Sequence, residues 1–311
     1  MGGCVEGIRV GKPKWLRRSL PSGPEYEKLR QMLKSRELTT VCQEAQCPNQ
    51  FECYGKGTAT FMILGERCTR NCGFCAVAHG ADEVPDESEP MRVAEAVVSL
   101  KLRYAVITSV TRDDLADGGA SFFAETIRAI RFHSPETLVE VLIPDLQGDW
   151  QSLQTILDAR PDVLNHNIET VKRLYPRVRP QAVYERSLAL LAEVKKRAGT
   201  MITKSGIMVG LGEKEKELLE TWQDLRRSGC DLLTIGQYLQ PGPNHLQVEN
   251  FVPPADFERY RGKALKLGFS GVASGPFVRS SYKAEKLYGK ALAGNDAGTV
   301  MDPDEGIKKR N

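Results

Sequence analysis

The sequence predicts an α/β protein, a partial (β/α)6 TIM-type barrel with N-terminal and C-terminal extensions. Between residues 60 and 267, apolar runs of strand length alternate six times with helical patterns. A strand followed by a helix, repeated in this way, is typical of a parallel sheet. Right-handed crossovers curl such a sheet toward a barrel, and six units fall short of the eight that close one. We therefore expect a barrel that is open on one side.

The elements are expected in the following order. Residues 1–57 show weak periodicity, and one short helix is predicted at Glu25–Lys34. The predicted buried strands are Thr60–Leu64, Tyr104–Ser109, Leu138–Ile143, Val163–His166, Ser205–Val209 and Leu232–Gly236. The predicted helices of the barrel are Arg92–Leu102, Ser121–Phe132, Trp150–Ala159, Ser187–Arg197, Lys214–Ser228 and Pro254–Leu267. The chain should divide into an extension over 1–57, a barrel over 58–270 and an extension over 271–311, disordered after Gly289.

Composition and charge are those of an ordinary globular protein. Hydrophobic residues make up 41% and charged residues 27% of the 311 residues. The net charge of +3 is too small to indicate a nucleic-acid partner. No apolar run is long enough to span a bilayer, and residues 1–10 lack the layout of a secretory signal. We expect a cytoplasmic protein without membrane or nucleic-acid partners.

Six of the eight cysteines lie between residues 42 and 75. Without an export signal, clustered cysteines favour metal binding, since disulfides need an oxidising compartment. Each set of three is one thiolate short of a closed zinc site or a four-cysteine iron–sulfur cluster. Two incomplete sets predict two clusters, each with one iron left for a non-cysteine ligand. The first triplet, C-x4-C-x5-C, is Cys42, Cys47 and Cys53, and the second, C-x3-C-x2-C, is Cys68, Cys72 and Cys75.

The two remaining cysteines are not expected to bind metal. Cys230 precedes a predicted strand and is interpreted as a small buried hydrophobe. Cys4 is interpreted as a free thiol in a loose tail.

The second triplet directly follows the first predicted strand. Ligands at the carboxyl end of a barrel strand lie where barrel active sites are built. The spacing of Cys68, Cys72 and Cys75 also fits one face of a helix, but the threonine, asparagine and glycine between them disfavour one. We therefore expect a loop that wraps a metal centre.

This loop resembles that of the radical S-adenosylmethionine superfamily. There, three thiolates of a C-x3-C-x2-C motif hold a [4Fe–4S] cluster, and the open fourth iron chelates S-adenosylmethionine. The resemblance implies that Cys68, Cys72 and Cys75 are the ligands. It also implies that one electron from the cluster splits the sulfonium to give methionine and a 5′-deoxyadenosyl radical.

Three further stretches are similar to the superfamily in strand order. Asp117–Gly119 resembles its Gly-Gly element, Asn165–Glu169 stands where ribose contacts are expected, and Gly206–Glu213 resembles the adenine-side element G-x-I-x-G-x-x-E. Taken alone, a glycine turn is an ordinary helix entry and His166 an ordinary core histidine. The resemblance implies cofactor contacts from Gly118, Gly119, Asn165, Asn167, Glu169 and Gly210.

The first triplet narrows the resemblance to the lipoyl synthase family. The similarity runs from Lys12 to Tyr282, and Tyr54 stands where the family has tryptophan; residues 78–86 are atypical too. The matching stretches are Val41–Cys53, Thr58–Gly65, Val106–Asp114, Glu140–Asp145, Gly236–Pro241 and the R-S-S-Y motif Arg279–Tyr282.

The family resemblance implies that Cys42, Cys47 and Cys53 hold an auxiliary [4Fe–4S] cluster with Ser281 as fourth ligand. These four residues are then also catalytic, because this cluster is the sulfur donor. A serine oxygen is a harder and more easily displaced iron ligand than a thiolate. The alternative for Ser280 and Ser281 is ordinary turn hydrogen bonding. Arg279 would either offset the charge of the cluster or cap a carbonyl.

The implied reaction inserts two sulfur atoms, at C6 and C8, into an octanoyl chain on a lysine of a lipoyl carrier domain. Implied partners are octanoylated E2 subunits and the glycine cleavage H protein, an electron donor such as ferredoxin or flavodoxin, and iron–sulfur assembly or carrier proteins. One alternative is a two-cluster electron carrier or a zinc-stabilised binding module, which needs no barrel after Cys75. Another is biotin synthase, from which the first triplet and the R-S-S-Y motif separate this chain.

Overall fold

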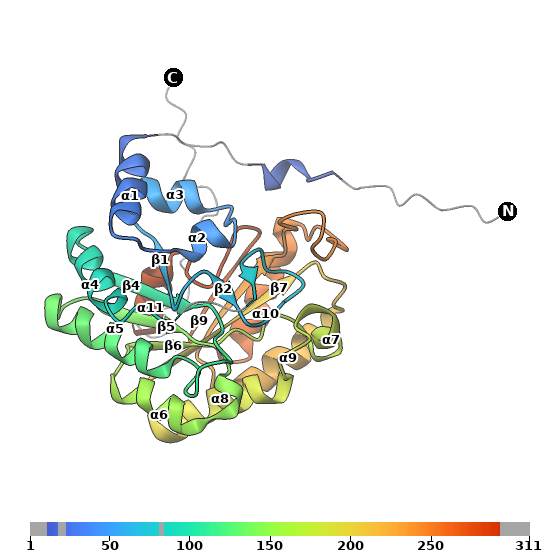
Figure 1. Cartoon of the computed structure of the whole chain (residues 1–311). Helices are drawn as coiled ribbons and strands as arrows, with labels where there is room; N and C mark the ends of the chain where they lie inside the picture. Colours follow the sequence, from blue (N-terminus) through green and yellow to red (C-terminus); the bar gives the residue numbers. More distant parts are fainter. Residues whose placement is uncertain (1–10, 18–22, 81–83, 293–311) are drawn as a thin grey trace.

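Seven parallel strands form one sheet that curls into an open barrel (Figure 1). A computed structural model of the chain describes residues 11–17, 23–80 and 84–292. The prediction of a partial α/β barrel is confirmed. The strands pair in chain order from β1 to β9: β1 (Thr60–Ile63), β4 (Tyr104–Ser109), β5 (Leu138–Leu142), β6 (Val163–Asn165), β7 (Ile202–Val209), β8 (Leu232–Gln237) and β9 (Gly271–Gly275).

The seventh strand, β9, adds to the six that the sequence predicts. Its five residues, G-V-A-S-G, hold only two apolar side chains, so no apolar run marks them. The strand exists because Leu232–Gly236 of β8 pairs with Gly271–Gly275 in parallel register. It lies in the segment that we expected to be a C-terminal extension.

Helices cover the outside of the sheet (Figure 1). All six predicted barrel helices are present, with ends within three residues of those predicted. Their amphipathic faces close over fully buried strand side chains, among them Phe61, Ile107 and Val141. These helices are α4 (Glu89–Ser99), α5 (Ala120–His133), α6 (Trp150–Asp158), α8 (Tyr184–Arg197), α9 (Glu215–Arg227) and α10 (Pro254–Lys266).

A buried polar cluster lies across four strands. The ammonium of Lys204 is 2.9 Å from a carboxylate oxygen of Glu140, and both side chains are buried. The hydroxyl of Tyr104 and the amide of Asn165 also donate to Glu140, at 2.6 and 2.9 Å. Because Lys204 is paired, β7 can begin at Ile202, three residues before the start that its apolar residues predict.

The N-terminal helices pack beside β1. The predicted helix is present as α1 (Pro24–Ser35), and it is followed by α2 (Val41–Glu44) and α3 (Gln50–Gly55). The ring of Tyr26 stacks on Phe51 with centroids 5.2 Å apart. The backbone amide of Met62 donates to the carbonyl of Thr39 at 2.9 Å. The extension that carries the first triplet is thereby joined to the edge of the sheet.

Short elements complete the fold. They are η1 (Lys14–Leu16), β2 (Arg67–Cys68), β3 (Ala78–His79), η2 (Leu146–Gly148), η3 (Lys172–Leu174), α7 (Tyr175–Val178) and α11 (Ala284–Leu292). The prediction of disorder after Gly289 is wrong for residues 290–292, which complete α11, because Leu287 of this helix packs with strand residues Leu232 and Ala273. Cys4 and residues 293–311 lie outside the described residues. None of the helices in the described ranges is both long and apolar enough to cross a membrane.

Candidate active site

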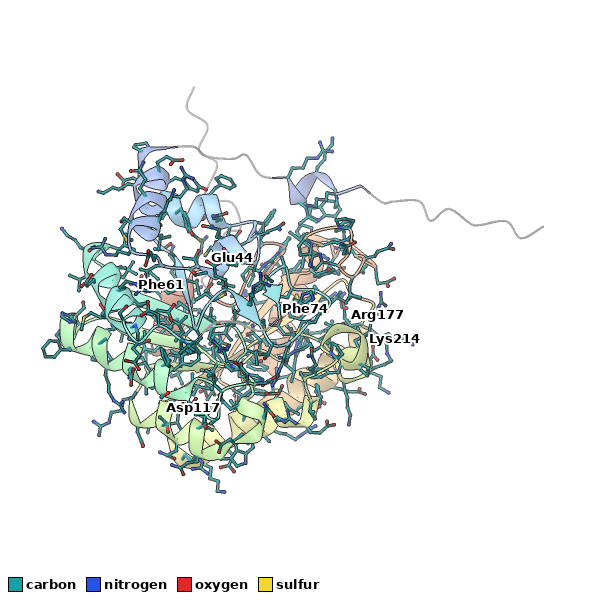
Figure 2. All side chains as sticks on the ribbon, in the orientation of Figure 1. Glu44, Phe61, Phe74, Asp117, Arg177 and Lys214 are labelled. Carbon is teal, nitrogen blue, oxygen red and sulfur yellow. The ribbon has the colours of Figure 1, made fainter. Side chains whose placement is uncertain are left out.

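The second cysteine loop is tied to neighbouring loops at the carboxyl ends of the strands. The backbone amides of Thr69 and Gly73 donate to the carbonyls of Thr111 and Val178, at 2.9 and 3.0 Å. Cys68 ends the short strand β2, and residues 69–77 form neither helix nor strand, so the predicted loop is confirmed for Cys72 and Cys75 (Phe74 is labelled in Figure 2). The loop is thus fixed at the end of the barrel where a parallel α/β fold places its active site.

The three thiols of this loop are close enough to influence one another. Burial is the main cause that raises the pKa of Cys75, to about 12, and the neighbouring thiols Cys72 and Cys68 add to it. Burial also raises the pKa of Cys72, while the positive charges of Arg179 and Arg70 oppose it. Since iron binds thiolates, loading this site releases protons, and the nearby cations favour the negative ligand set.

Arg70, between the first two cysteines of the loop, anchors it by buried ion pairs. Its guanidinium contacts the carboxylates of Asp113 at 2.7 Å and Asp145 at 2.6 Å. Burial alone would raise the pKa of Asp145, but the hydrogen bonds and charge of Arg70 lower it to about 2 from 3.8. A lowered carboxyl pKa stabilises the fold above about pH 4, and this contribution is lost as the pH falls through about 2.

We expect the substitution Arg70→Met to lower the free energy of unfolding at pH 7 by about 3 kcal/mol. It leaves the buried carboxylate of Asp145 with the amide of Gln147, at 3.1 Å, and only one cation, Arg186, at 3.4 Å. Urea denaturation followed by circular dichroism measures this. The matched control is Arg259→Met, which removes exposed pairs to Asp256 and Glu215 and should cost far less, because water screens these charges. Equal losses in the two variants would contradict the anchoring role.

The first triplet forms a second compact group of thiols. Cys42 lies in α2, Cys53 lies in α3, and the amide of Cys47 donates to the carbonyl of Cys42 at 3.0 Å. Burial, and then the charge of Cys47, raise the pKa of Cys42 to about 11. Burial, and then the charges of the other two thiols, raise the pKa of Cys53 to about 12.

The R-S-S-Y motif is brought to the first triplet. The side-chain amide of Asn49 donates to the carbonyl of Phe277 at 2.7 Å, and the hydroxyl of Tyr282 donates to the carboxylate of Glu52 at 3.2 Å. Ser281 lies between these two contacts in the chain. Of the two roles considered for Arg279, the structure shows the contact with a carbonyl, because its Nη1 donates to the carbonyl of Val278 at 2.6 Å.

The glycines predicted to contact S-adenosylmethionine stand at constrained turns. Gly118 and Gly119 have φ of +60° and +87°, and a Cβ on Gly119 would collide with the side chain of Leu64. Gly210 has φ +103°, and a Cβ there would collide with Gln237. The carboxylate of Glu213 accepts from the amide of Leu211 at 2.9 Å and so fixes the same turn. The positive φ and this close packing require glycine at both turns.

The three polar residues predicted on β6 fall into two places. Asn167 donates to Glu169 at 3.0 Å, beyond the end of the strand. Burial raises the pKa of Glu169, while the charge of Arg179 opposes the shift. Asn165 lies deeper in the sheet, fully buried on Glu140, with its Oδ1 lacking a hydrogen-bond partner. Asn167 and Glu169 are therefore the pair best placed for a ligand.

His166 and Cys230 are core residues. The ring of His166 contacts the carbonyl of Ile143 and the hydroxyl of Ser187, and burial lowers its pKa to about 4. Cys230 is fully buried just before β8, which confirms its prediction as a small hydrophobe.

Arg179 is a candidate that the sequence analysis missed. Its guanidinium donates to the carbonyl of Asn167 at 2.9 Å, its charge acts on Cys72 and Glu169, and its Nε is buried without a hydrogen-bond partner. A lone arginine before Pro180 carries no spacing signal. Only the fold reveals a cation that could receive a ligand carboxylate beside the cysteine loop.

The donor sets fit iron–sulfur clusters by their chemistry. Each holds three soft thiols, and all six are free. The fit is one of donor chemistry and not of geometry, since within the described ranges no group of three or more His, Cys, Asp or Glu side chains is arranged to hold a metal ion.

Comparison with known proteins agrees with this site. The profile of the Radical SAM superfamily matches residues 62–225, and that of the N-terminal domain of lipoyl synthase matches residues 5–47. Solved structures with a similar fold include methylornithine synthase, with a TM-score of 0.52 and 13% identity over 92% of this chain and 88% of that one. HydG, a maturase of the [FeFe]-hydrogenase, has a TM-score of 0.54 and 14% identity over 79% of this chain and 66% of its own.

The fold and the cysteine loop therefore define a radical S-adenosylmethionine enzyme, a class that carries a [4Fe–4S] cluster and uses S-adenosylmethionine. Lipoyl synthase of Desulfotalea psychrophila is 70% identical over 92% of this chain and 96% of its own length. The lipoyl synthase of Alkaliphilus metalliredigens is 54% identical over 90% of this chain and 96% of its own length. The chain belongs to the lipoyl synthase family, and its activity is that of a lipoyl synthase.

Proposed function

We propose that two [4Fe–4S] clusters serve this activity, one held by Cys68, Cys72 and Cys75 and an auxiliary one held by the first triplet and Ser281. When bound, the first would supply the electron that splits S-adenosylmethionine, and the auxiliary cluster would supply the two sulfur atoms inserted at C6 and C8 of octanoyl-lysine. The division rests on the two separate thiol groups described above. Residues 1–57 would carry the auxiliary-cluster cysteines, residues 58–270 together with strand β9 the barrel, and the rest of the C-terminal extension the R-S-S-Y motif.

The residues around the second triplet would hold and orient S-adenosylmethionine. Gly118, Gly119 and Gly210 would contact it through their backbone groups, and Asn167 and Glu169 offer partners for hydroxyl groups. The unpartnered Nε of Arg179 suits a carboxylate. Asn165 lies deeper in the barrel and would support the S-adenosylmethionine site from there, held in place by its hydrogen bond to Glu140.

Ser281 would be the exchangeable ligand of the auxiliary cluster. The support is its position between Phe277 and Tyr282, both of which contact the first triplet segment. An oxygen ligand leaves iron more readily than a thiolate does, which suits a centre that loses sulfur.

The partners follow from the reaction. A lipoyl synthase acts on lipoyl carrier proteins and needs a reductant, for which we propose octanoylated E2 subunits or the glycine cleavage H protein, and a ferredoxin or flavodoxin. Assembly or carrier proteins would restore the consumed cluster. We propose the cytoplasm as the compartment, because thiolate ligands persist where thiols stay reduced.

The single observation that carries the proposal is the presence of two groups of three free thiols, one of them at the carboxyl end of β1. The experiment that tests it is anaerobic incubation of the reconstituted protein with an octanoylated carrier domain, S-adenosylmethionine and dithionite. We expect lipoyl-lysine and two molecules of 5′-deoxyadenosine per product. A product without sulfur would contradict the proposal.

A further inference from the structure

The residues on either side of Ser281 are held by two different sites. On one side, the hydroxyl of Ser280 donates to Oδ1 of Asn167 at 2.9 Å, at the end of β6. On the other side, the hydroxyl of Tyr282 contacts Glu52, the neighbour of Cys53, at 3.2 Å. One short segment therefore joins the predicted S-adenosylmethionine contacts to the first triplet.

The direction of these hydrogen bonds is fixed by chemistry. The side-chain nitrogen of Asn167 donates to Oε1 of Glu169 at 3.0 Å. The carbonyl oxygen of Asn167 then faces Ser280, which must donate. Loss of the Ser280 hydroxyl would remove one of the two contacts that orient the amide of Asn167.

The segment is seated on two strand glycines that leave it room. A Cβ on Gly236 of β8 would collide with the carbonyl of Val278. A Cβ on Gly206 of β7 would lie 2.7 Å from Oδ1 of Asn167 and 2.9 Å from Oγ of Ser280. The charge of Arg279 also acts on Glu169. Backbone, hydroxyl and charge thus hold residues 278–280 against the strand ends.

We propose that Ser280 is a positioning residue that couples the S-adenosylmethionine site to the auxiliary cluster, an inference that rests on the proposed function. By its bond to Asn167 it orients that amide for S-adenosylmethionine. Because consecutive Cα atoms are about 3.8 Å apart, the same bond limits where Ser281 can lie. Coupling of this kind is reciprocal, so a change at one site is felt at the other.

The test is the variant Ser280→Ala, studied anaerobically with both clusters loaded. Loss of one orienting hydrogen bond should weaken binding of S-adenosylmethionine about three- to tenfold, as measured by equilibrium dialysis. The Mössbauer signal of the oxygen-ligated iron of the auxiliary cluster should change in the same variant.

The matched control is Ser274→Ala in β9. This variant removes a hydroxyl that donates to the carbonyl of Phe257 in α10, at 2.8 Å. It should alter neither readout. An unchanged or tighter affinity in Ser280→Ala would overturn the inference, and so would weaker affinity with an unchanged iron signal. The proposed function is read separately from Cys68→Ala. If the Cys68→Ala variant still cleaves S-adenosylmethionine, the proposed function is refuted. If Cys68→Ala is inactive and Ser280→Ala is unaffected, only the proposed coupling is refuted.

Discussion

Replacement of Cys68, Cys72 or Cys75 with alanine is expected to abolish cleavage of S-adenosylmethionine. Each variant loses a thiolate that the proposed cluster has no other protein group to replace. The loss should exceed the roughly 10–100-fold typical of removing an outer-sphere partner of a metal site. Chromatographic measurement of 5′-deoxyadenosine under anaerobic reducing conditions checks this.

The matched control for the three cysteine variants is Cys230→Ala. Cys230 is also a free cysteine, but its thiol donates to the carbonyl of Leu232 in the core, at 3.3 Å. This variant should keep cleaving S-adenosylmethionine at the rate of the unaltered protein. Persistent 5′-deoxyadenosine formation in the Cys68, Cys72 or Cys75 variants would refute the assignment of the second triplet.

The substitution Cys47→Ala is expected to separate the two halves of the reaction. Cys47 is only half-buried, unlike Cys42, so its loss disturbs packing less. The second triplet stays intact, and hydrogen abstraction from the octanoyl chain should continue. Sulfur insertion should stop, because the auxiliary cluster is no longer held. Mass spectrometry of the carrier domain, with 5′-deoxyadenosine measured in the same sample, checks both halves.

A lipoyl product from the Cys47 variant would remove the sulfur-donor role of the first triplet. Loss of both 5′-deoxyadenosine and product would instead show that the first triplet supports the fold of the whole site. Radical formation without sulfur insertion, the predicted outcome, is expected only if the two triplets hold two centres with separate roles.

The sequence predicted the parts of the fold that carry their own local pattern. Strands such as Tyr104–Ser109 are apolar runs, and helices such as Pro254–Lys266 have apolar residues at helical spacing with proline at the start. Such signals are local and therefore readable. β9 has no such run, and α11 begins in the polar sequence just after Tyr282. β9 forms because it pairs with β8, and α11 forms because Leu287 packs against β8 and β9. These tertiary contacts leave no pattern in the local sequence.

The site divides in the same way. The cysteine spacings could be read from the sequence, because the three cysteines of each triplet stand close together in the chain. The role of the R-S-S-Y motif came only from the family resemblance, because Ser281 is distant from the first triplet in the chain. The partners of those ligands could not be read from the sequence. Arg70 meets Asp145 across 75 positions, and Ser280 meets Asn167 across 113. For Asn165 the resemblance implied a ligand contact, and what the sequence could not show is that the side-chain nitrogen donates to Glu140 of the neighbouring strand.

The account depends most on the auxiliary cluster giving its own sulfur to the substrate. The direct measurement is the mass of the lipoyl product from protein whose clusters were reconstituted with heavy-isotope sulfide and then freed of excess sulfide. The account predicts a product that is heavier by two labelled sulfur atoms in a single turnover. A product of natural mass, formed in full yield, would contradict it.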